Sequence, residues 1–570
     1  MRSLAQCLLD TEMARLRAVA RFWDIDLPAG RRREVAARLA GEMSAPQVIA
    51  EAVEALPDDQ RRVLDALLVA GGRMPRRIFT RRWGEIRPMG PGRMEREQPW
   101  REPVSAAEGL WYRGFIFPAF EQGPEGAYQV VFVPPELRER LPLPKITPPV
   151  ITLEPAPAPS AARVGGDALL DDGCTLLAYL QNEQLRPASD GSWPARGLSN
   201  LARRLRDPDP ERLAFLVHLA RRLAWSRTTD SGWLRPDPET ATDWLRSPPG
   251  QQRLALAQGW RDDPQWNDLF HVPTLRPEDT GAWRNDPLLA RAAILRHLEV
   301  CAPGAWYEIR GLSAAIRQAD PDFQRPDGDY NSWYIRDAAS DAYLSGFESW
   351  DAVEGALIHY LITGPLAWLG LTDLDGDSPP AFFRLSPAGA AFLGLTPLPS
   401  ETEPAQLTLR PDFTVRVPPA RRYERFQLAR VADWVSSPLA REAERGLFLY
   451  RLTPNSLERG RRQGIPVARV LEFLARVTAA PVPRSVAAAL TRWEARGAEA
   501  RLERVVLLRF SDEKLMDEVV SAPAARRLVR ERVGPAAALV REQDWPRLAA
   551  ALGEMGLLPE IVALEEKSAD

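Results

Sequence analysis

The stretch Leu449–Pro483, LYRLTPNSLERGRRQGIPVARVLEFLARVTAAPVP, predicts two short amphipathic helices that are separated by a glycine turn and stopped by a pair of prolines. Thr453 is a typical N-cap, and Pro454 suits the first helical position because its missing N–H costs nothing there. Gly464 is typical of a residue that ends a helix. From Val467 onward apolar residues recur at helical spacing, which predicts a second helix with one buried face.

Further elements are predicted on both sides of this stretch. LTLRPDFTVRVP alternates apolar and polar residues and predicts a strand that is interrupted at Pro411. RYERFQLARVADWV predicts a helix that offers Phe426 and Trp434 to a core. PRSVAAALTRWEAR predicts another helix, and ARLERVVLLRF predicts a strand after it. We therefore expect residues 401–570 to form one α/β domain.

Residues 405–530 resemble the amino-terminal domain of the XPB family of DNA repair and transcription helicases. The resemblance is carried by LTLRPDFTVRVP, YRLTPNSLERGRRQGIP, VLEFLARVTAAPVPRSV and RVVLLRFSDEKLMDEVVSAP. In that family the region lies ahead of the motor, where it helps to engage DNA and to dock a partner subunit. The resemblance implies a helicase-associated domain without chemistry of its own.

The sequence contains no motif for an ATP-driven motor. A motor of this kind needs GxxxxGK[ST], and none of the three lysines, Lys145, Lys514 and Lys567, lies in such a context. The four histidines form no HExxH or HxH pair, and the acidic runs lack the spacing of a calcium loop. We therefore expect no catalytic residue, no metal site and no cofactor, and we predict that the protein is not an enzyme.

The amino-terminal 50 residues predict two helices joined by an extended turn, and this pattern resembles the SAP-type DNA-binding motif. The second helix begins with Arg31, Arg32 and Arg33. Three positive charges oppose the macrodipole at a helix amino terminus, at a cost of up to about 1 kcal/mol. A bound phosphate reverses that cost. The alternative interpretation is a solvated arginine cluster.

Residues 51–141 predict three helices followed by a β-hairpin, which is the order of a winged helix. Its second helix, MPRRIFTRRWG, carries Arg76, Arg77 and Arg81. Residues 142–166, PLPKITPPVITLEPAPAPSAARVGG, hold seven prolines and predict an extended linker. Residues 167–285 and 286–400 share a pattern of helices, a turn between strands, and a last helix that begins with Asp-Pro or Ser-Pro. Both predict further winged-helix units. The expected fold class is therefore mainly α with small β-hairpins (α+β), in several domains.

Charge is distributed unevenly along the chain. Basic residues outnumber acidic ones in residues 1–100 and 401–570, whereas acidic residues outnumber basic ones between them, and the formal net charge is -3. Phosphate binding depends on local positive charge, so the two ends are the candidates for contact with nucleic acid. The excess of arginine over lysine also fits a GC-rich genome. The sequence lacks an apolar run long enough to span a membrane, and we therefore predict a cytoplasmic protein. We also predict that its three cysteines are buried thiols.

Two functions remain open on these observations. The first is a non-catalytic adaptor that binds duplex or junction DNA through arginine, with the acidic middle region serving as a spacer or a partner site. The second is a scaffold that docks a helicase or nuclease supplied in trans without binding DNA itself. The predicted DNA-binding residues are Arg31, Arg32, Arg33, Arg76, Arg77, Arg81, Arg484, Arg492 and Arg496. A third possibility, an enzyme of unknown type, has no recognisable site behind it.

Overall fold

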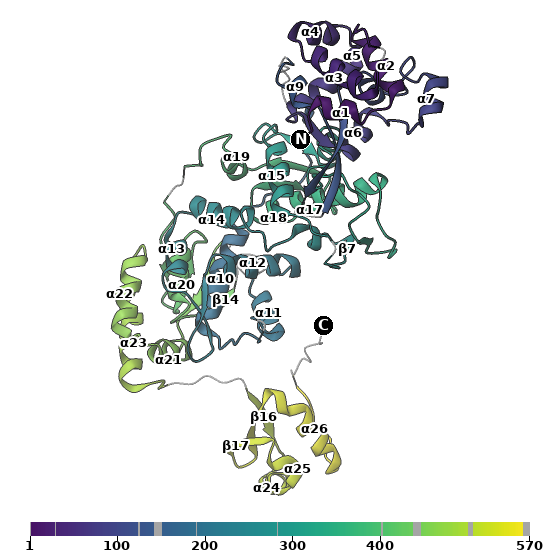
Figure 1. Ribbon diagram of the computed structural model, residues 1–570. Coiled ribbons are helices and arrows are strands. Elements are labelled where there is room, and N and C mark those ends of the chain that lie inside the picture. The colour runs from purple at the N-terminus through teal and green to yellow at the C-terminus, as the bar shows by residue number, and fades with distance from the viewer. Residues whose placement is uncertain are drawn as a thin grey trace. The chain divides into compact units, whose positions relative to one another are not determined.

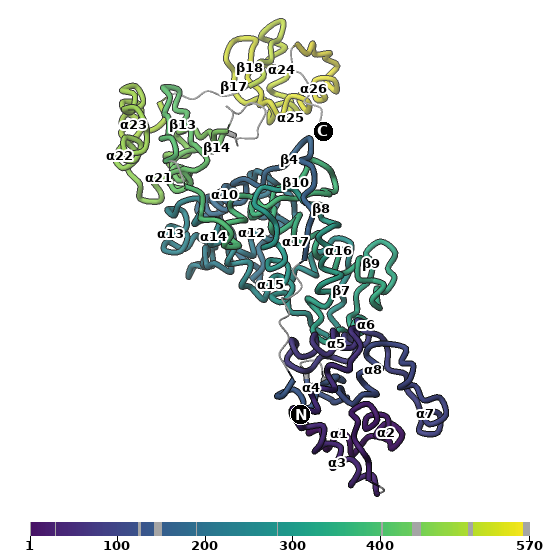
Figure 2. The backbone as a smooth tube through the Cα atoms, turned by 90° about the horizontal axis from the view of Figure 1, so that it is seen from above, coloured from purple at the N-terminus to yellow at the C-terminus, as the bar shows by residue number. Residues whose placement is uncertain are grey.

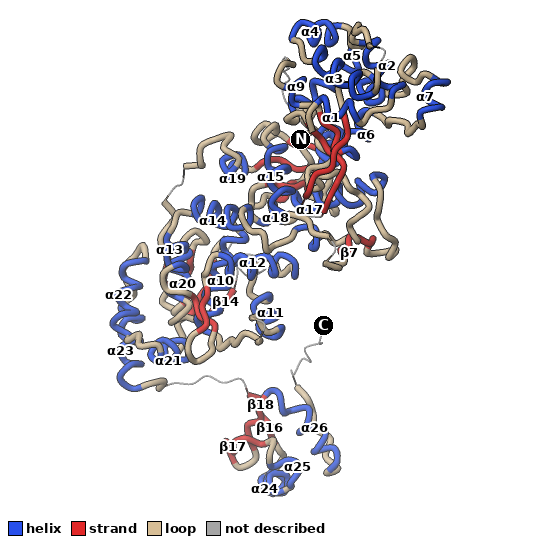
Figure 3. The backbone as a smooth tube through the Cα atoms, in the orientation of Figure 1, coloured by secondary structure: helices blue, strands red, loops and turns tan. Residues whose placement is uncertain are grey.

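The protein, seen as a computed structural model in Figure 1, is a mixed α+β chain, which confirms the predicted fold class. Figure 3 shows the strands gathered in small sheets among many helices. Two compact units can be distinguished, residues 1–459 with 474–481 and residues 460–473 with 482–570. No helix in the described part of the chain is long and apolar enough to cross a membrane. The structure describes residues 2–28, 30–123, 126–141, 151–189, 191–281, 283–400, 403–436, 446–499 and 505–562.

The first 54 residues contain four helices, where the sequence predicts two helices joined by an extended turn. Ser3 caps the first helix by accepting a hydrogen bond from the Gln6 N–H at 3.2 Å. Leu16, Val19 and Trp23 are all buried. The helices are α1 (Leu4–Leu9), α2 (Met13–Phe22), α3 (Arg32–Met43) and α4 (Pro46–Glu54).

Residues 58–138 follow the predicted order of three helices and a hairpin, with one extra strand, β1, and two extra helices, α7 and α9. The three strands form an antiparallel sheet in the order β1-β3-β2. The buried residues of this segment and of the first four helices form one hydrophobic cluster, so the two share a core. The elements are α5 (Asp58–Val69), β1 (Arg73–Pro75), α6 (Arg76–Trp83), α7 (Pro91–Glu97), α8 (Ala106–Tyr112), β2 (Phe117–Gly123), β3 (Gly126–Phe132) and α9 (Pro135–Arg138).

Residues 168–277 are largely helical. Asp237 accepts hydrogen bonds from the N–H groups of Glu239 and Thr240, at 3.1 and 3.0 Å. The helix itself begins at Thr240 with Glu239 at the N-cap position, so the predicted Asp-Pro start precedes the helix instead of beginning it. The elements are α10 (Ala168–Asn182), α11 (Ala195–Ala202), α12 (Pro210–Arg222), β5 (Ser226–Thr228), β6 (Leu234–Pro236), α13 (Thr240–Arg246), α14 (Pro249–Arg261), η1 (Asp268–His271) and β7 (Leu275–Pro277).

Residues 287–392 contain five α-helices and three of the four strands of a sheet in the order β4-β10-β11-β8, in which β4 spans Ala162–Arg163. Ser386 accepts a hydrogen bond from the Gly389 N–H at 3.0 Å, which confirms the predicted cap. The elements are α15 (Pro287–Leu298), β8 (Trp306–Glu308), α16 (Ile309–Ala319), β9 (Ile335–Asp337), η2 (Phe347–Ser349), the π-helical turn η3 (Asp351–Gly355), α17 (Ala356–Thr363), α18 (Pro365–Trp368), β10 (Thr372–Asp375), β11 (Phe382–Leu385) and α19 (Pro387–Phe392).

The predicted proline-rich linker joins this sheet over part of its length. Residues 142–150 lie outside the described residues. Ala156 donates its N–H to the Trp306 carbonyl at 2.7 Å, and β4 (Ala162–Arg163) pairs with β10 at the edge of the sheet. The second half of the segment is therefore part of the fold, because its backbone hydrogen bonds are satisfied by the sheet rather than by water.

Residues 408–477 begin with a sheet in the order β12-β13-β15-β14. Thr453 accepts a hydrogen bond from the Ser456 N–H at 3.1 Å, and Gly464 has φ +77°, so both predicted helix signals are confirmed. The elements are β12 (Thr408–Leu409), β13 (Thr414–Val417), α20 (Arg422–Leu428), β14 (Asp433–Ser436), β15 (Phe448–Arg451), α21 (Pro454–Arg462) and α22 (Val467–Val477).

One prediction in this region is wrong. The helix predicted through Trp434 ends at Leu428, and Trp434 lies in β14 opposite Tyr450. The local pattern allowed either structure. Pairing with β15, which is distant in the sequence, satisfies the backbone of β14 and outweighs the helical preference of the segment.

The remaining elements of the chain, from α23 onward, lie in the second unit. Here a sheet in the order β16-β18-β17 packs over a small core that includes Val519, Val540 and Leu548. The predicted strand after residue 504 and the helix that contains DEVV (517–520) are both present. The elements are α23 (Arg484–Arg496), β16 (Val505–Arg509), α24 (Glu513–Ser521), α25 (Pro523–Arg526), β17 (Val529–Gly534), β18 (Ala537–Arg541), η4 (Glu542–Asp544) and α26 (Trp545–Glu554).

All three cysteines are buried and free, as predicted. Burial raises the pKa of the Cys7 thiol to about 11 and that of Cys301 to about 12. Since the thiolate is the reactive form, we expect neither to react with iodoacetamide at pH 8 in the native chain. Mass spectrometry of alkylated peptides should find both thiols modified only after denaturation in urea. Alkylation of either thiol in the native chain would contradict this burial.

Candidate nucleic-acid interface

Arg31, Arg32 and Arg33 lie at the amino terminus of α3, with Arg31 at the N-cap position, and all three side chains are exposed. The Glu34 carboxylate accepts a hydrogen bond from the Arg31 N–H at 3.3 Å and adds a negative charge to the first turn. Among the described residues, no carboxylate lies within ion-pair distance of these three guanidinium groups. They are the predicted residues best placed to receive a phosphate from solution.

The arginines of α6 contact other parts of the same chain. Arg76 donates to the Gln129 side chain at 2.9 Å. Arg77 forms an ion pair with Asp329, and Arg81 forms one with Asp322. The Arg81 guanidinium also lies over the Tyr330 ring, 5.0 Å from its centroid. In Figure 2, α6 accordingly lies beside the segment that leads to β9.

These contacts change what α6 can do. Asp322 and Asp329 already neutralise the positive charges that a phosphate would bind. Burial raises the pKa of Asp322 above its ordinary value. Arg77 and Arg81 must leave their carboxylates before they can bind DNA. We therefore assign no phosphate contact to Arg77 or Arg81.

The three predicted arginines of α23 remain at the surface. Arg484 is exposed. Arg492 and Arg496 both contact Glu499, the second at 3.4 Å, and about two thirds of each arginine side chain is exposed. Exposed ion pairs of this type contribute about 0–1 kcal/mol, so a phosphate can compete for them. Arg484, Arg492 and Arg496 therefore stay available as a second basic cluster, within the second unit.

Sequence reasoning missed a buried ionic network between α10 and α20. Arg422 is fully buried and binds Asp171 and Asp167, each at 2.9 Å. Arg425 lies over the Phe448 ring at 3.7 Å and donates to the Cys174 sulfur at 3.3 Å. Neither arginine can reach a phosphate. Their role is to hold the sheet that contains β15 against α10.

Asp167 gives this network a pH dependence. Burial on its own raises the pKa of this carboxyl, but Arg422 and then Arg253 outweigh it and hold the pKa below its ordinary value. A carboxyl with a lowered pKa in the folded state stabilises the protein above its unfolded pKa of about 3.9, and the stabilisation is lost as pH falls through the lower folded value. Stability should therefore drop below about pH 4.

This dependence can be tested with Asp167→Asn. We expect the urea midpoint of the wild-type chain to fall more between pH 5 and pH 3 than that of the variant, because the variant has no carboxyl to protonate at this position. Other carboxyls contribute equally to both chains. Identical pH profiles for the two proteins would show that Asp167 is not coupled to the arginines in solution.

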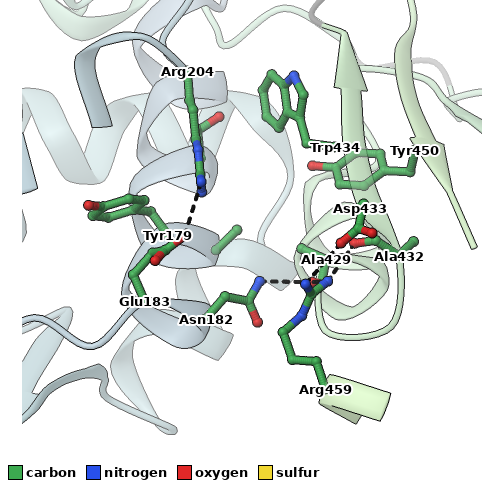
Figure 4. A pocket seen from close by; sticks show the side chains of 12 residues that line it. Tyr179, Asn182, Glu183, Arg204, Ala429, Ala432, Asp433, Trp434, Tyr450 and Arg459 are labelled. Atoms are coloured by element: carbon green, nitrogen blue, oxygen red, sulfur yellow. Dashed lines mark hydrogen bonds and ion pairs between the residues drawn. The ribbon is translucent and has the colours of Figure 1, made fainter. Parts of the chain in front are cut away.

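A cavity lies beside the network, between α10 and the strands β14 and β15 (Figure 4). Its volume is about 270 Å³. Two ion pairs stand at its edges, Arg204 with Glu183 at 3.0 Å and Arg459 with Asp433 at 2.9 Å. Its lining residues are Thr175, Ala178, Tyr179, Asn182, Glu183, Arg204, Ala429, Ala432, Asp433, Trp434, Tyr450 and Arg459.

Histidine and acidic side chains give no sign of a metal centre in the described part of the chain, where no group of three or more potential ligands comes together. Each histidine instead contacts a group of its own chain. The partners are Asp263 for His218, Glu211 for His271, Asp320 for His297 and the Pro380 carbonyl for His359.

Comparison with known proteins gives one match. Residues 407–534 match the family model described as helicase conserved C-terminal domain. A search of curated proteins finds no match. The matched residues start in the sheet that α20 fixes to α10 and continue through β17 of the second unit, so they belong to both compact units. The match links the protein to helicase-associated families.

Proposed function

We propose that the protein is a non-catalytic, DNA-binding adaptor that works with a helicase or nuclease supplied in trans, in DNA repair or transcription. The observation that carries this proposal is the helicase-domain match at residues 407–534 in a sequence without a phosphate-cradling GxxxxGK[ST] motif. The resemblance of residues 405–530 to the amino-terminal domain of XPB helicases supports the same role, since that domain engages DNA without chemistry of its own.

The exposed arginines supply the contact with DNA in this proposal. Arg31, Arg32 and Arg33 have no carboxylate partner among the described residues, and they stand at the amino terminus of a helix, where anions are favoured. Arginine binds phosphate oxygens through two parallel N–H groups. The cluster on α23 adds a second contact of the same chemistry.

The winged-helix interpretation of residues 51–141 and 286–400 is part of the proposal. In both segments a strand follows a helix, further helices come next, and two antiparallel strands follow them. The first strand of the sheet lies next to the last: the orders are β1-β3-β2 and β8-β11-β10. In a DNA-reading unit of this kind the third helix enters the major groove. Here most residues of that helix are buried, in α8 as in α17. We therefore assign both units to structural or protein-contact roles.

The buried third helices favour a second candidate function, a scaffold that docks a helicase or nuclease without binding DNA. The acidic excess of residues 101–400 points the same way, because it repels phosphate. Co-purification of such an enzyme with the tagged chain, together with no binding of the isolated chain to DNA, would select this function over the first.

One experiment tests the adaptor role directly. Labelled duplex is titrated with the full chain while phosphate release from ATP is followed in the same samples. We expect a rise in fluorescence anisotropy that ATP does not change, and no phosphate release with or without DNA. ATP hydrolysis stimulated by DNA would overturn the non-catalytic part of the proposal, and an unchanged anisotropy would overturn the DNA-binding part.

A further inference from the structure

The cavity between α10 and the strands β14 and β15 contains a polar group that the protein leaves without a partner. The Tyr450 side chain is 2% exposed, and its hydroxyl has no hydrogen-bond partner among the described residues. Figure 4 shows this hydroxyl directed into the space between α10 and the strands. A ligand with a matching polar atom would form a hydrogen bond with this hydroxyl, with a net contribution of about 0.5–1.5 kcal/mol.

The chemistry of this hydroxyl is well defined. Burial raises the pKa of Tyr450 above its ordinary value, so the group stays protonated at neutral pH. A protonated phenol can donate one hydrogen bond and accept others. The expected ligand therefore carries neutral donor or acceptor atoms at this point, rather than a metal ion or a bare anion.

Two further polar atoms around the cavity have no partner in the protein. Asn182 donates its side-chain N–H to the Ala429 carbonyl at 2.8 Å, but its Oδ1 accepts no hydrogen bond. Arg459 donates to Asp433 at 2.9 Å, but its Nε–H finds no acceptor. Both atoms are buried behind the cavity wall, so the Tyr450 hydroxyl is the polar atom on which the argument for a ligand rests.

Aromatic rings complete two sides of the space. Tyr179 lies on α10, and Trp434 lies on β14, where it packs edge-on against Tyr450 with ring centroids 5.8 Å apart. Planar heterocycles stack on rings of this kind, with a contribution of about 1–3 kcal/mol for each base. The Arg204 guanidinium lies over the Tyr179 ring, 5.1 Å from its centroid, so the Trp434 ring and the Tyr450 hydroxyl are the groups that suit a nucleobase.

Positive charge stands at the edge of the cavity. Arg204 is paired with Glu183 at 3.0 Å, but 41% of its side chain is exposed. Such a half-exposed pair is weak, so the remaining N–H groups of the guanidinium can bind a phosphate. The volume of about 270 Å³ lies just below the usual range of about 300–1,000 Å³ for ligand sites, which limits the occupant to one base with its sugar.

We propose that this cavity binds a single nucleotide, with its base against Trp434 and Tyr450 and its phosphate at Arg204. The nucleotide is either an unpaired residue of a DNA strand or a free nucleotide, and the first of these sources rests on the proposed DNA-binding function. In the strand case the cavity would give the adaptor a preference for junctions and single-stranded ends, since only an unpaired base can enter it.

Two arms of one experiment separate these sources. In the first arm, the four deoxynucleoside monophosphates are titrated into the full chain by calorimetry. In the second arm, the affinity for a forked duplex is compared between an overhang with bases and an overhang with abasic sites at the same positions. We expect the wild-type chain to bind the base-containing overhang about tenfold more tightly, the size of one stacking interaction.

Tyr450→Phe is the decisive variant because it removes only the unpartnered hydroxyl. The folded chain loses no hydrogen bond by this change, so thermal stability should not fall. The affinity for the base should fall about three- to tenfold, as for one lost hydrogen bond. Trp434→Leu should remove most of the preference for bases over abasic sites. Tyr334→Phe, which removes a hydroxyl from an exposed tyrosine elsewhere, is the matched control and should change neither quantity.

Each outcome decides a separate question. Free nucleotides that bind in a Tyr450-dependent manner, without any preference between base and abasic overhangs, would identify the free nucleotide as the ligand. If free nucleotides bind in a Tyr450-dependent manner and the chain binds no DNA, the proposed function is wrong, but the cavity is still a nucleotide-binding site. The inference is wrong if neither arm detects base binding, or if base binding is unchanged in both Tyr450→Phe and Trp434→Leu.

Discussion

Replacing Asp171 by alanine is expected to lower the free energy of unfolding around α10 and α20 by about 3–5 kcal/mol. Asp171 is fully buried and binds Arg422 at 2.9 Å and Arg206 at 2.5 Å. Its removal leaves the buried Arg422 with only the partly exposed Asp167 as a charged partner. An uncompensated buried charge is among the most costly changes a folded protein can undergo.

Hydrogen exchange in increasing urea measures this effect locally, which matters in a chain with two compact units. Peptides from α10 and α20 should exchange faster in the variant, whereas peptides from α24 and α26 should not change. Glu42→Ala, which breaks the exposed pair of Glu42 with Arg38, is the control and should cost less than about 0.5 kcal/mol.

A double variant separates the charge effect from the loss of packing. Asp171→Leu combined with Arg422→Met replaces the pair by apolar side chains, and this should recover much of the stability because neither member of the pair is then left buried without the other. If Asp171→Ala costs no more than Glu42→Ala, the network does not hold the matched domain to α10.

Replacing Arg31, Arg32 and Arg33 together by alanine is expected to weaken binding to duplex DNA roughly a hundredfold at low salt. Each phosphate contact releases counterions, so the slope of log affinity against log salt should become less steep by about 0.9 for each arginine that binds phosphate, or about three in all. Fluorescence anisotropy at four salt concentrations gives both the affinity and the slope. The three side chains are exposed, so the fold should tolerate the change.

The matched control removes the same charge from the acidic middle of the chain. Arg276 and Arg296 are exposed and Arg261 is partly exposed, and each has a nearby carboxylate partner. Their joint replacement by alanine should leave the slope almost unchanged. Equal changes of slope in the two triple variants would mean that total charge, and not the amino terminus of α3, determines binding.

The sequence predicted those features that local chemistry decides. Thr453 with Pro454 begins a helix and Gly464 ends it because a cap and a left-handed residue act within one turn. Ser386 caps its helix for the same reason. These elements needed no knowledge of the rest of the fold.

Features that depend on distant partners could not be predicted in this way. Trp434 lies in a strand because β15 pairs with it. Arg422 binds Asp171, a residue 251 positions away in the sequence, and Arg81 binds Asp322, 241 positions away. No local sequence pattern distinguishes an arginine that binds a buried carboxylate from one that is exposed and can bind a phosphate. The cavity at Tyr450 escaped prediction for the same reason, since its two walls come from separate regions.

The central claim is that exposed arginines of this helicase-linked protein bind nucleic-acid phosphate. It is tested most directly by the affinity of the unmodified chain for single-stranded, duplex and forked DNA between about 50 and 200 mM salt. We predict that affinity falls steeply with salt for all three, with a slope of about −3 or steeper, and that the fork binds most tightly. An affinity that does not change with salt, or no binding to any of the three, would contradict the account.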